Sequence, residues 1–600
     1  MTLPSERSIQ DLLGGIELFA GIDPASLARL AAEADVRHLP GGEALIREGD
    51  PSDALFVVAS GRLQAFVGGE GGETLVGEIG RGEVIGEMGI LADEPRSATV
   101  RALRDSNLVH IPAEEFVRFL REEPDELFAI TRLLIQRLRR SIRSEAAGAS
   151  VRTITVVPVG DGEGAATFAR YLTSILAERG DTRLVTGEDV DELQEDSDLT
   201  RLLHDLETDH DLLIYLADRK PSTWTDRCLR QADRVVLVGE AGGESALTEV
   251  ERNLLGPDSA LVRARIDLVL VQRAEAETPR GGPRWLAQRP VHRLHHVRLH
   301  SRDDLHRVAR ALTGREIALV LSGGGARGIA HFGLFRALEE LEIPVDVVGG
   351  SSFGSIAGAA LAMGWSWEEQ RRIFYDSFVS QGSPIDFTAP ALALAKGAKV
   401  TAGIKGGFGD AMIENMWLRY YCVSSNLSAG EVAVHTRGPL WKALRASVAI
   451  PGLWPPVPSE EGDLLVDGGV MNNLPVDVMT GFADAGAIIA ANLKGSAQLP
   501  STGLADDGIL SGWGPFARRL SPLGAGSELP GIVELLLRAT ETGNVLSAKR
   551  LEHEADVVLH PDVTEFGLLA WERMDEIIEA GYRYAIKELP QHEEMLKRLL

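Results

Sequence analysis

The feature that most constrains the fold is a pair of short strand-like runs, each followed by a glycine-rich turn. Residues 317–321 are consecutive apolar residues that lead into a glycine loop at 322–328, and the run at 345–348 leads into a second turn at 349–354. Two such runs joined by a helix form a parallel βαβ unit. Because ligands bind beyond the carboxyl ends of parallel strands, these two loops mark the expected site.

The second turn has the form of a nucleophile elbow. Residues 350–354 read Gly-Ser-Ser-Phe-Gly, which fits G-x-S-x-G, a strained strand-to-helix turn that pushes its central hydroxyl outward. The small residues at 355–362 predict a helix whose positive end faces Ser352. Ser352 is therefore the predicted nucleophile.

The glycine loop can direct several backbone N–H groups at one point, as an oxyanion hole requires. The residues expected to form it are Gly323, Gly324, Gly325, Ala326, Arg327 and Gly328. Arg327 either adds fixed positive charge or braces the loop. The same glycine spacing also fits a dinucleotide fingerprint, but the acid of that motif should close the second strand, and Asp346 opens it. A nucleotide cofactor is therefore the weaker interpretation.

A serine nucleophile needs a base, and residues 463–469 supply a carboxylate. Asp467 ends an apolar run and precedes two glycines, so it stands at the carboxyl end of a strand, as Ser352 does. Taken alone, this pattern also fits an aspartate that caps its own turn. Because a carboxylate is a weak base for serine, we expect burial to raise its pKa or the helix end to lower the pKa of Ser352.

In order and spacing, the glycine loop, the elbow and Asp467-Gly468-Gly469 resemble the patatin-like phospholipases. In that family serine and aspartate form a dyad without histidine, the aspartate is the base, and the glycine loop is the oxyanion hole. The resemblance implies hydrolysis of a phospholipid or lysophospholipid through an acyl-enzyme, with no required cofactor and no metal. Phe353 stands where the family often has a smaller residue, and its ring can narrow the acyl pocket.

Two further segments of this region invite a functional interpretation. Residues 446–457 are apolar, stiffened by prolines and similar to the family's segment, which fits either a wall of the acyl pocket or ordinary core. Residues 387–417, rich in Ala, Gly and Met, fit a lid or a lipid-facing flap.

The first part of the chain carries short β-type runs separated by glycine turns, which predict a small barrel or jelly roll. Residues 86–91, with Arg96 soon after, resemble the phosphate-binding cassette of cyclic-nucleotide-binding domains. The resemblance implies that a helix N-terminus and Arg96 hold the cyclic phosphate of cAMP or cGMP and that Glu87 accepts the ribose hydroxyl. The residues assigned to this site are Gly86, Glu87, Met88, Arg96 and Ser97. A vestigial barrel kept for assembly is the alternative.

The chain is expected to be a multidomain α/β protein with three parts. Residues 1–145 are predicted to form the jelly-roll barrel and an amphipathic helix at 124–145. The resemblance to cyclic-nucleotide-binding domains implies that this helix closes over the base and pairs subunits. Residues 151–310 are predicted to be an α/β spacer of degenerate nucleotide fold, because the turn at 160–166 lacks the lysine and Ser/Thr of a P-loop. Residues 315–600 are predicted to be a patatin-like α/β sandwich. Together the parts resemble bacterial members of the neuropathy target esterase group.

Composition limits location and partners. Two cysteines, Cys228 and Cys422, cannot build a disulfide framework, which favours a reducing compartment. The start of the chain lacks a signal peptide, and no apolar run approaches the roughly 20 residues of a membrane span. We expect a cytoplasmic protein with peripheral contact at the inner membrane surface. A net charge of −27 argues against nucleic-acid binding.

Two alternatives to the dyad hydrolase remain open. One is a Ser-Asp-His triad, for which His553, His560 and His592 are the histidines after Asp467. The other is a cyclic-nucleotide-sensing scaffold whose hydrolase part is silent. Two sites on one chain also suggest that a cyclic nucleotide shifts hydrolase activity.

Overall fold

The fold was analysed in a computed structural model. The structure describes residues 9–10, 13–14, 24–69, 72–92, 94–122, 151–160, 164–190, 202–203, 205–207, 209–256, 264–380, 382–383, 385–389, 392–493 and 550–600. The chain forms two compact units, residues 1–276 with 280–314 and residues 277–279 with 315–600. The helix expected at 124–145 and the centre of the P-loop-like turn, 161–163, lie outside the described residues. The division into three domains stays a prediction.

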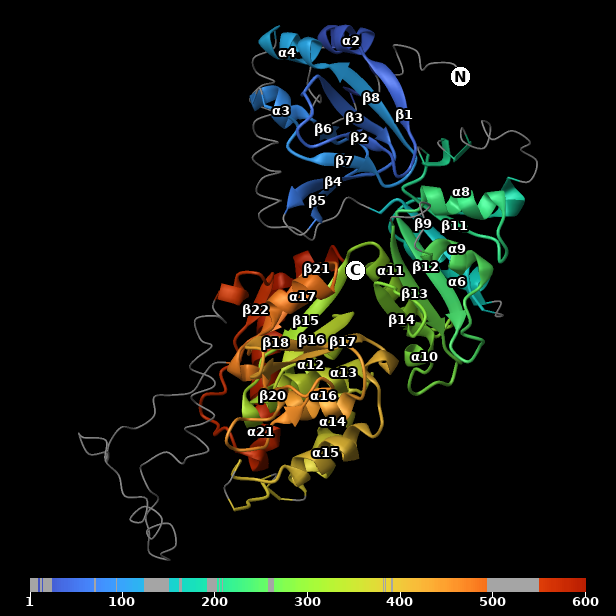
Figure 1. Ribbon diagram of the computed structural model, residues 1–600. Coiled ribbons are helices and arrows are strands. Elements are labelled where there is room, and N and C mark those ends of the chain that lie inside the picture. Colours follow the sequence, from blue (N-terminus) through green and yellow to red (C-terminus); the bar gives the residue numbers. More distant parts are fainter. Residues whose placement is uncertain are drawn as a thin grey trace, which may run out of the picture. The chain divides into compact units, whose positions relative to one another are not determined.

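The N-terminal part of the first unit is a jelly roll of two four-stranded antiparallel sheets (Figure 1). Their orders are β1-β8-β3-β6 and β2-β7-β4-β5. The strands are β1 (Asp35–Leu39), β2 (Ala44–Ile46), β3 (Ala54–Ser60), β4 (Leu63–Gly69), β5 (Gly72–Ile79), β6 (Val84–Ile85), β7 (Thr99–Ala102) and β8 (Ser106–Pro112). The expected barrel is thereby confirmed.

Strand β3 shows why this sequence forms a two-layered core. All of its residues are buried, and alternate side chains point to opposite faces of a strand. Leu55 and Val57 pack with helices α2 (Pro24–Ala32) and α4 (Ala113–Glu122), whereas Phe56 and Val58 pack with the apolar residues between the two sheets. The apolar run of β3 therefore serves both layers at once.

The rest of the first unit is a six-stranded parallel sheet of order β10-β11-β9-β12-β13-β14. Its strands are β9 (Thr153–Pro158), β10 (Thr182–Val185), β11 (Leu212–Leu216), β12 (Arg234–Glu240), β13 (Arg265–Val271) and β14 (Arg293–Val297). One face packs on α6 (Gly164–Leu176) and α11 (Arg302–Leu312), and the other packs on α8 (Thr223–Gln231) and α9 (Glu249–Leu255). Both faces are covered, as parallel sheets require, which confirms the expected α/β architecture.

The second unit is built on an eight-stranded sheet of order β19-β20-β17-β16-β15-β21-β22, with β18 beside β17. Its strands are β15 (Glu316–Leu321), β16 (Val347–Ser351), β17 (Arg419–Asn426), β18 (Glu431–His435), β19 (Val457–Pro458), β20 (Leu464–Asp467), β21 (Ala485–Ala491) and β22 (Val557–Leu559). Strands β15 and β16 are adjacent and parallel, so the predicted βαβ unit is present. Strand β20, in contrast, runs antiparallel to β17.

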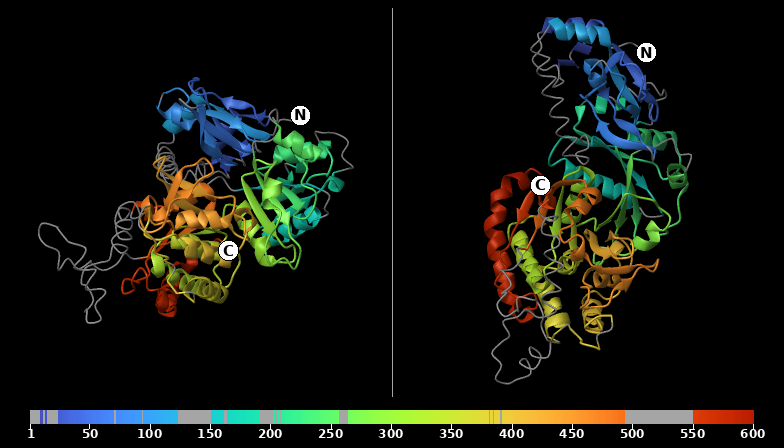
Figure 2. Two further views of the ribbon diagram at one scale, coloured as in Figure 1. Left: turned by 60° about the horizontal axis from the view of Figure 1, so that its bottom comes forward. Right: turned by 60° about the vertical axis from the view of Figure 1, so that its left-hand side comes forward.

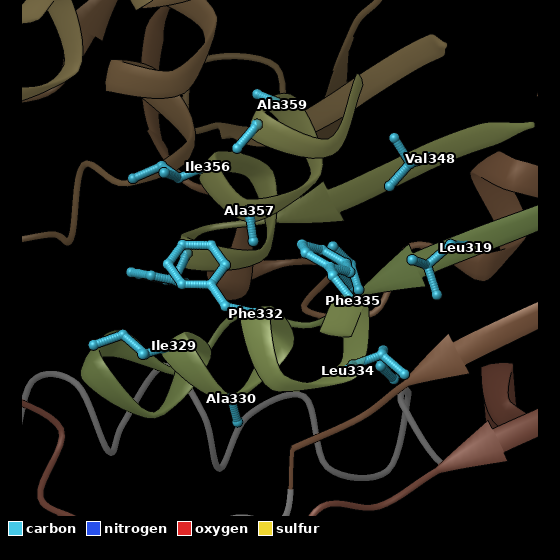
Figure 3. Packing of buried hydrophobic residues seen from close by; sticks show 14 of the residues in the cluster. Leu319, Ile329, Ala330, Phe332, Leu334, Phe335, Val348, Ile356, Ala357 and Ala359 are labelled. Atoms are coloured by element: carbon cyan, nitrogen blue, oxygen red, sulfur yellow. The ribbon is translucent and has the colours of Figure 1, made fainter. Parts of the chain in front are cut away.

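Helix α12 (Ala330–Glu340) connects β15 to β16 and supplies much of the core. Figure 3 shows its Phe332 and Phe335 between the strands that carry Leu319 and Val348 and the helix that carries Ala357. That helix is α13 (Phe353–Ala362), which follows the elbow. The helix that follows the elbow is therefore packed in the core of this unit.

Helices α12 and α21 (Met574–Glu588) approach each other so closely that their backbones touch (Figure 2). A side chain at Gly333 would overlap the carbonyl oxygen of Ile578, and one at Gly581 would overlap that of Ala330. Helix α21 is thus packed against α12, the helix that follows the glycine loop. Within the described part of the chain, no helix has both the length and the apolar character that a membrane crossing needs.

Candidate active site

Ser352 occupies a strained turn between β16 and α13. Its φ is 50° and its ψ is −124°, a conformation that is costly for a residue with a side chain. The turn is this sharp because its flanking residues lack side chains. A Cβ atom at Gly350 would lie 2.6 Å from the backbone of Gly354, and one at Gly354 would overlap the carbonyl oxygen of Leu321.

The structure brings Ser352 and Asp467 into direct contact. The Ser352 hydroxyl donates a hydrogen bond of 2.8 Å to Asp467 Oδ2, and the Gly469 N–H donates one of 2.8 Å to Oδ1. The Ser352 N–H donates to Ser447 Oγ at 3.0 Å, and the Ser447 hydroxyl donates to the Val423 carbonyl at 2.7 Å. Hydrogen bonds to neighbouring residues therefore hold Ser352 and the Asp467 carboxylate in place.

The register of the sheet explains how the two side chains meet. Ser351 of β16 pairs with Val423 of β17, and the next β17 residue, Ser424, pairs with Asp467 of β20. Strand β20 is short and antiparallel, so its carboxyl end lies level with the carboxyl end of β16. The expectation that Asp467 ends a strand is met, but the strand approaches from the opposite direction.

Burial changes the acidity of Asp467. Its side chain is almost fully enclosed (4% exposed), and this burial raises its pKa to about 7 against the lowering effect of hydrogen bonds from Ser352 and Gly469. The expected rise of the Asp467 pKa through burial is thereby confirmed. At neutral pH this carboxylate can take a proton from the hydroxyl beside it.

The glycine loop offers fewer free donors than its sequence suggests. The Gly323 N–H donates to Asn473 Oδ1 at 3.2 Å, and the Ala326 N–H donates to the Leu568 carbonyl at 2.9 Å. The Arg327 N–H donates to the Gly324 carbonyl at 3.1 Å. Among the residues that the structure describes, the N–H groups of Gly324 and Gly325 have no hydrogen-bond acceptor. These two N–H groups are therefore candidates for binding an oxyanion.

Buried side chains that the motifs did not reveal support the loop. Arg327 donates from Nε to the Phe566 carbonyl at 2.8 Å, so it braces the loop. His331 lies below the loop with Nε2 2.9 Å from the Ser322 carbonyl, and its burial lowers its pKa to about 4. His331 is therefore neutral and donates from Nε2. No sequence pattern marked His331 or Asn473 as neighbours of the site, and Ser447 was marked only as part of segment 446–457.

An apolar pocket opens beside Ser352. It holds about 590 Å³ of space, its open mouth included. The residues that line it are Gly325, Ser352, Phe353, Ile356, Phe374, Phe378, Val400, Val448, Ile450, Leu453, Trp454, Leu568, Leu569 and Trp571. Segment 446–457 contributes four of these side chains, which places it on the pocket wall. The Phe353 ring lies 5.3 Å from that of Phe374 and 6.1 Å from that of Trp571, so it takes up part of this space.

The later histidines lie in other surroundings. His553 is exposed, and His592 is half-buried at the start of α22 (Glu593–Lys597). His560 has Nδ1 3.3 Å from the Asn492 carbonyl and Nε2 3.5 Å from Glu552 Oε1. The hydrogen bonds of the Asp467 carboxylate go to Ser352 and Gly469. The described residues thus show a pair of side chains and no triad.

In the jelly roll, the structure places Gly86 and Arg96 in contact. Arg96 is buried and donates to the Ala54 carbonyl at 2.7 Å, to Asp53 Oδ1 at 3.2 Å and to the Gly86 carbonyl at 3.3 Å. Glu87 is buried at the start of α3 (Glu87–Ala92). The remaining residues of the expected site, Met88 and Ser97, are exposed.

Three models of known domains match successive parts of the chain. Residues 36–123 match the cyclic nucleotide-binding domain, residues 150–318 match the P-loop like domain of the neuropathy target esterase family, and residues 319–480 match the patatin-like phospholipase. A solved cyclic nucleotide-binding domain from Methylobacillus flagellatus is 24% identical, covers 23% of this chain and 79% of its own, and has a TM-score of 0.21.

Two curated relatives cover most of the chain. Patatin-like phospholipase domain-containing protein 7 of Rattus norvegicus is 31% identical over 92% of this chain and 45% of its own length. Lysophospholipase nte1 of Aspergillus oryzae is 31% identical over 90% of this chain and 40% of its own length. The chain therefore spans less than half the length of these relatives.

The raised pKa of Asp467 predicts a pH-dependent stability. The folded protein holds this proton up to about pH 7, whereas an unfolded aspartate loses it near pH 4. The free energy of unfolding therefore falls as pH rises through this window, because the folded state binds more protons. Replacing Asp467→Asn should relieve the buried charge, so the variant should gain more stability over wild type at pH 8 than at pH 5.

Urea unfolding at the two pH values measures this difference, with Glu565→Gln as a control for the loss of one exposed negative charge. An equal effect of Asp467→Asn at both pH values would contradict the prediction.

Proposed function

Because the chain carries the domains of the neuropathy target esterase group of patatin-like phospholipases, we propose that it hydrolyses acyl esters of phospholipids or lysophospholipids. The observation that carries this proposal is the 2.8 Å hydrogen bond between Ser352 and Asp467 beside an apolar pocket. The pocket walls suit a fatty acyl chain, since apolar side chains form them almost entirely.

In the proposed mechanism, Asp467 accepts the proton of Ser352 as the serine oxygen attacks the acyl carbonyl carbon. The N–H groups of Gly324 and Gly325 stabilise the negative oxygen of the tetrahedral intermediate. The alcohol leaves with the proton from Asp467, and an acyl-enzyme remains. Water then attacks the acyl carbon while Asp467 takes a proton from it, and the fatty acid and free Ser352 are regenerated.

The jelly roll is proposed to bind cAMP or cGMP as a regulatory ligand, and no cofactor is proposed for hydrolysis. The match of residues 36–123 and the presence of both Glu87 and Arg96 support this assignment. The Arg96 guanidinium donates hydrogen bonds to backbone carbonyls. It has to break these hydrogen bonds to bind the cyclic phosphate. A cytoplasmic location with peripheral membrane contact, and assembly through this domain, belong to the same proposal.

The two alternatives make different demands on the site. A triad needs a histidine that links to Asp467, and the hydrogen bonds of both carboxylate oxygens argue against one. A silent scaffold would not need a strained serine beside a buried carboxylate. Backbone strain of this kind clusters at functional sites, which favours an active hydrolase.

Replacing Ser352→Ala should lower fatty-acid release from a lysophospholipid by about a thousandfold or more, because the acyl-enzyme can no longer form. Release of free fatty acid from a panel of lysophospholipids by the purified chain is the measurement. Ser351→Ala is the matched control, since its hydroxyl is buried in the same turn without a hydrogen-bond partner among the described residues. Substantial activity in Ser352→Ala would exclude the assigned nucleophile.

The triad alternative has its own control. The combined change His553→Gln, His560→Gln and His592→Gln should leave turnover close to wild type, since none of these side chains is placed to orient Asp467. Loss of activity with any one of them would favour the triad.

The pKa of Asp467 also predicts the pH dependence of catalysis. Only the ionised carboxylate can accept the serine proton, so kcat/KM should rise with pH and reach half of its plateau near pH 7. A short-chain glycerol ester, which has no titrating group, is the appropriate substrate. A flat profile between pH 5.5 and 8.5 would show that Asp467 is not the base.

For the jelly roll, we expect Arg96→Gln to weaken binding of cAMP or cGMP by tenfold or more, because a charged contact to the phosphate is lost. Calorimetric titration of the full chain measures this, with Arg47→Gln, an exposed arginine of the same barrel, as control. Failure of both nucleotides to bind the wild-type chain would favour the vestigial barrel. Equal turnover with and without saturating nucleotide would exclude regulation by these ligands.

A further inference from the structure

The surface beside the pocket carries a charge opposite to that of the chain as a whole. Residues 387–409 contain three lysines and no aspartate or glutamate, although the net charge of the chain is −27, and the flanking acids are Asp386 and the exposed Asp410. The acid that precedes this stretch, Asp386, accepts the N–H groups of Gly397 and Ala398 at 2.9 Å. Its charge is therefore directed at the first turn of α15 (Ala398–Phe408).

The same surface exposes large apolar side chains. Phe387 is 69% exposed and Leu392 is 73% exposed, the highest values among the large apolar residues that the structure describes. Large apolar side chains that are exposed and lie together mark an interaction site. Tyr375 and Leu569 are further exposed apolar residues at elements that line the pocket.

Hydrogen bonds fix this apolar segment to the wall of the acyl pocket. The Leu394 N–H donates to the Gly452 carbonyl and the Ala395 N–H donates to the Leu453 carbonyl, both at 2.9 Å. Phe387 pairs with Ala395 as an antiparallel bridge, and Leu453 lines the pocket. Phe387 and Leu392 therefore stand next to the pocket and not at a remote place on the sheet.

The three lysines keep their charged ends at the surface. Lys396 and Lys399 are exposed, and Lys399 Nζ donates to the Ser383 carbonyl at 3.2 Å. Lys405 lies in the last turn of α15, with Nζ 4.0 Å from the centre of the Trp441 ring. One ammonium group thus lies just before α15, one in its first turn and one in its last turn.

We propose that Phe387, Leu392, Lys396, Lys399 and Lys405 form a docking surface for an anionic lipid bilayer. Phe387 and Leu392 would enter the apolar layer while the lysines contact headgroup phosphates, an arrangement typical of interfacial binding. Each lysine near an anionic surface strengthens binding by about fivefold. That an acyl chain then passes from the bilayer into the pocket rests on the proposed hydrolase function.

The net negative charge of the whole chain opposes its binding to an anionic bilayer. The remaining acidic surface is repelled by anionic lipid, so only groups within about 8 Å of the headgroups can favour docking at physiological salt. A basic and apolar surface could also attract the acidic face of a second copy of the chain. Because this surface lies next to an apolar pocket, lipid is the favoured partner. The experiment has to distinguish lipid binding from self-association of the chain.

The test uses the Ser352→Ala chain, so that lipid is not consumed, in co-sedimentation with phosphatidylcholine vesicles with and without phosphatidylglycerol. The parent should bind the anionic vesicles at least tenfold more tightly, and added salt should weaken binding. Adding Phe387→Ser and Leu392→Ser should reduce binding to both vesicle types by tenfold or more. Adding Lys396→Gln, Lys399→Gln and Lys405→Gln should remove the preference for anionic vesicles.

Exposed residues of the same kinds serve as matched controls: Val434→Ser on β18 and Lys587→Gln on α21 should bind like the parent. Parent-like binding by the docking variants would overturn the proposal. So would a change in their oligomeric state, measured by light scattering, without a change in vesicle binding, since this would assign the surface to a second copy.

Hydrolysis of a soluble short-chain ester, measured with Ser352 intact, separates this proposal from the proposed function. The docking variants should keep this activity and lose turnover of vesicle lipid. An active esterase whose variants handle vesicles normally would overturn the docking surface alone. Vesicle binding without any ester hydrolysis would overturn the hydrolase function and leave the docking surface standing.

Discussion

The site depends on one physical constraint, a carboxylate held where its negative charge is costly. Burial of Asp467 removes the water that would stabilise its anion, and the Ser352 hydroxyl and the Gly469 N–H compensate only in part. The under-solvated anion is a better proton acceptor than an ordinary aspartate. The strained elbow fixes the hydroxyl, and the register of β20 on β17 fixes the carboxylate. The sheet therefore supplies both the chemistry and the geometry.

The parts that sequence predicts well are those determined by close backbone contacts. Gly350 and Gly354 are needed because other atoms occupy the space of a side chain, so the motif and the turn imply each other. The βαβ unit follows from two buried runs at the right distance. The jelly roll follows from short runs between glycine turns. In each case a few neighbouring residues carry the whole signal.

The parts that sequence could not predict depend on residues far along the chain. Nothing near Asp467 shows that its strand runs antiparallel and still ends beside Ser352. Nothing in the glycine loop shows that Asn473 and Leu568 occupy two of its N–H groups and leave Gly324 and Gly325. These features arise only when distant segments pack together, so a local motif predicts the class of site but not which N–H groups of the loop stay without an acceptor.

The glycine loop is held by residues that lie far from it in the sequence. Leu568 and Phe566 hold the loop, yet they are translated long after Ser352 and Asp467. A loss of these contacts would free the loop that carries Gly324 and Gly325 but would leave the hydrogen bond between Ser352 and Asp467 in place. Phe566 and Leu568 thus tie the geometry of the loop to a part of the chain that contains neither Ser352 nor Asp467.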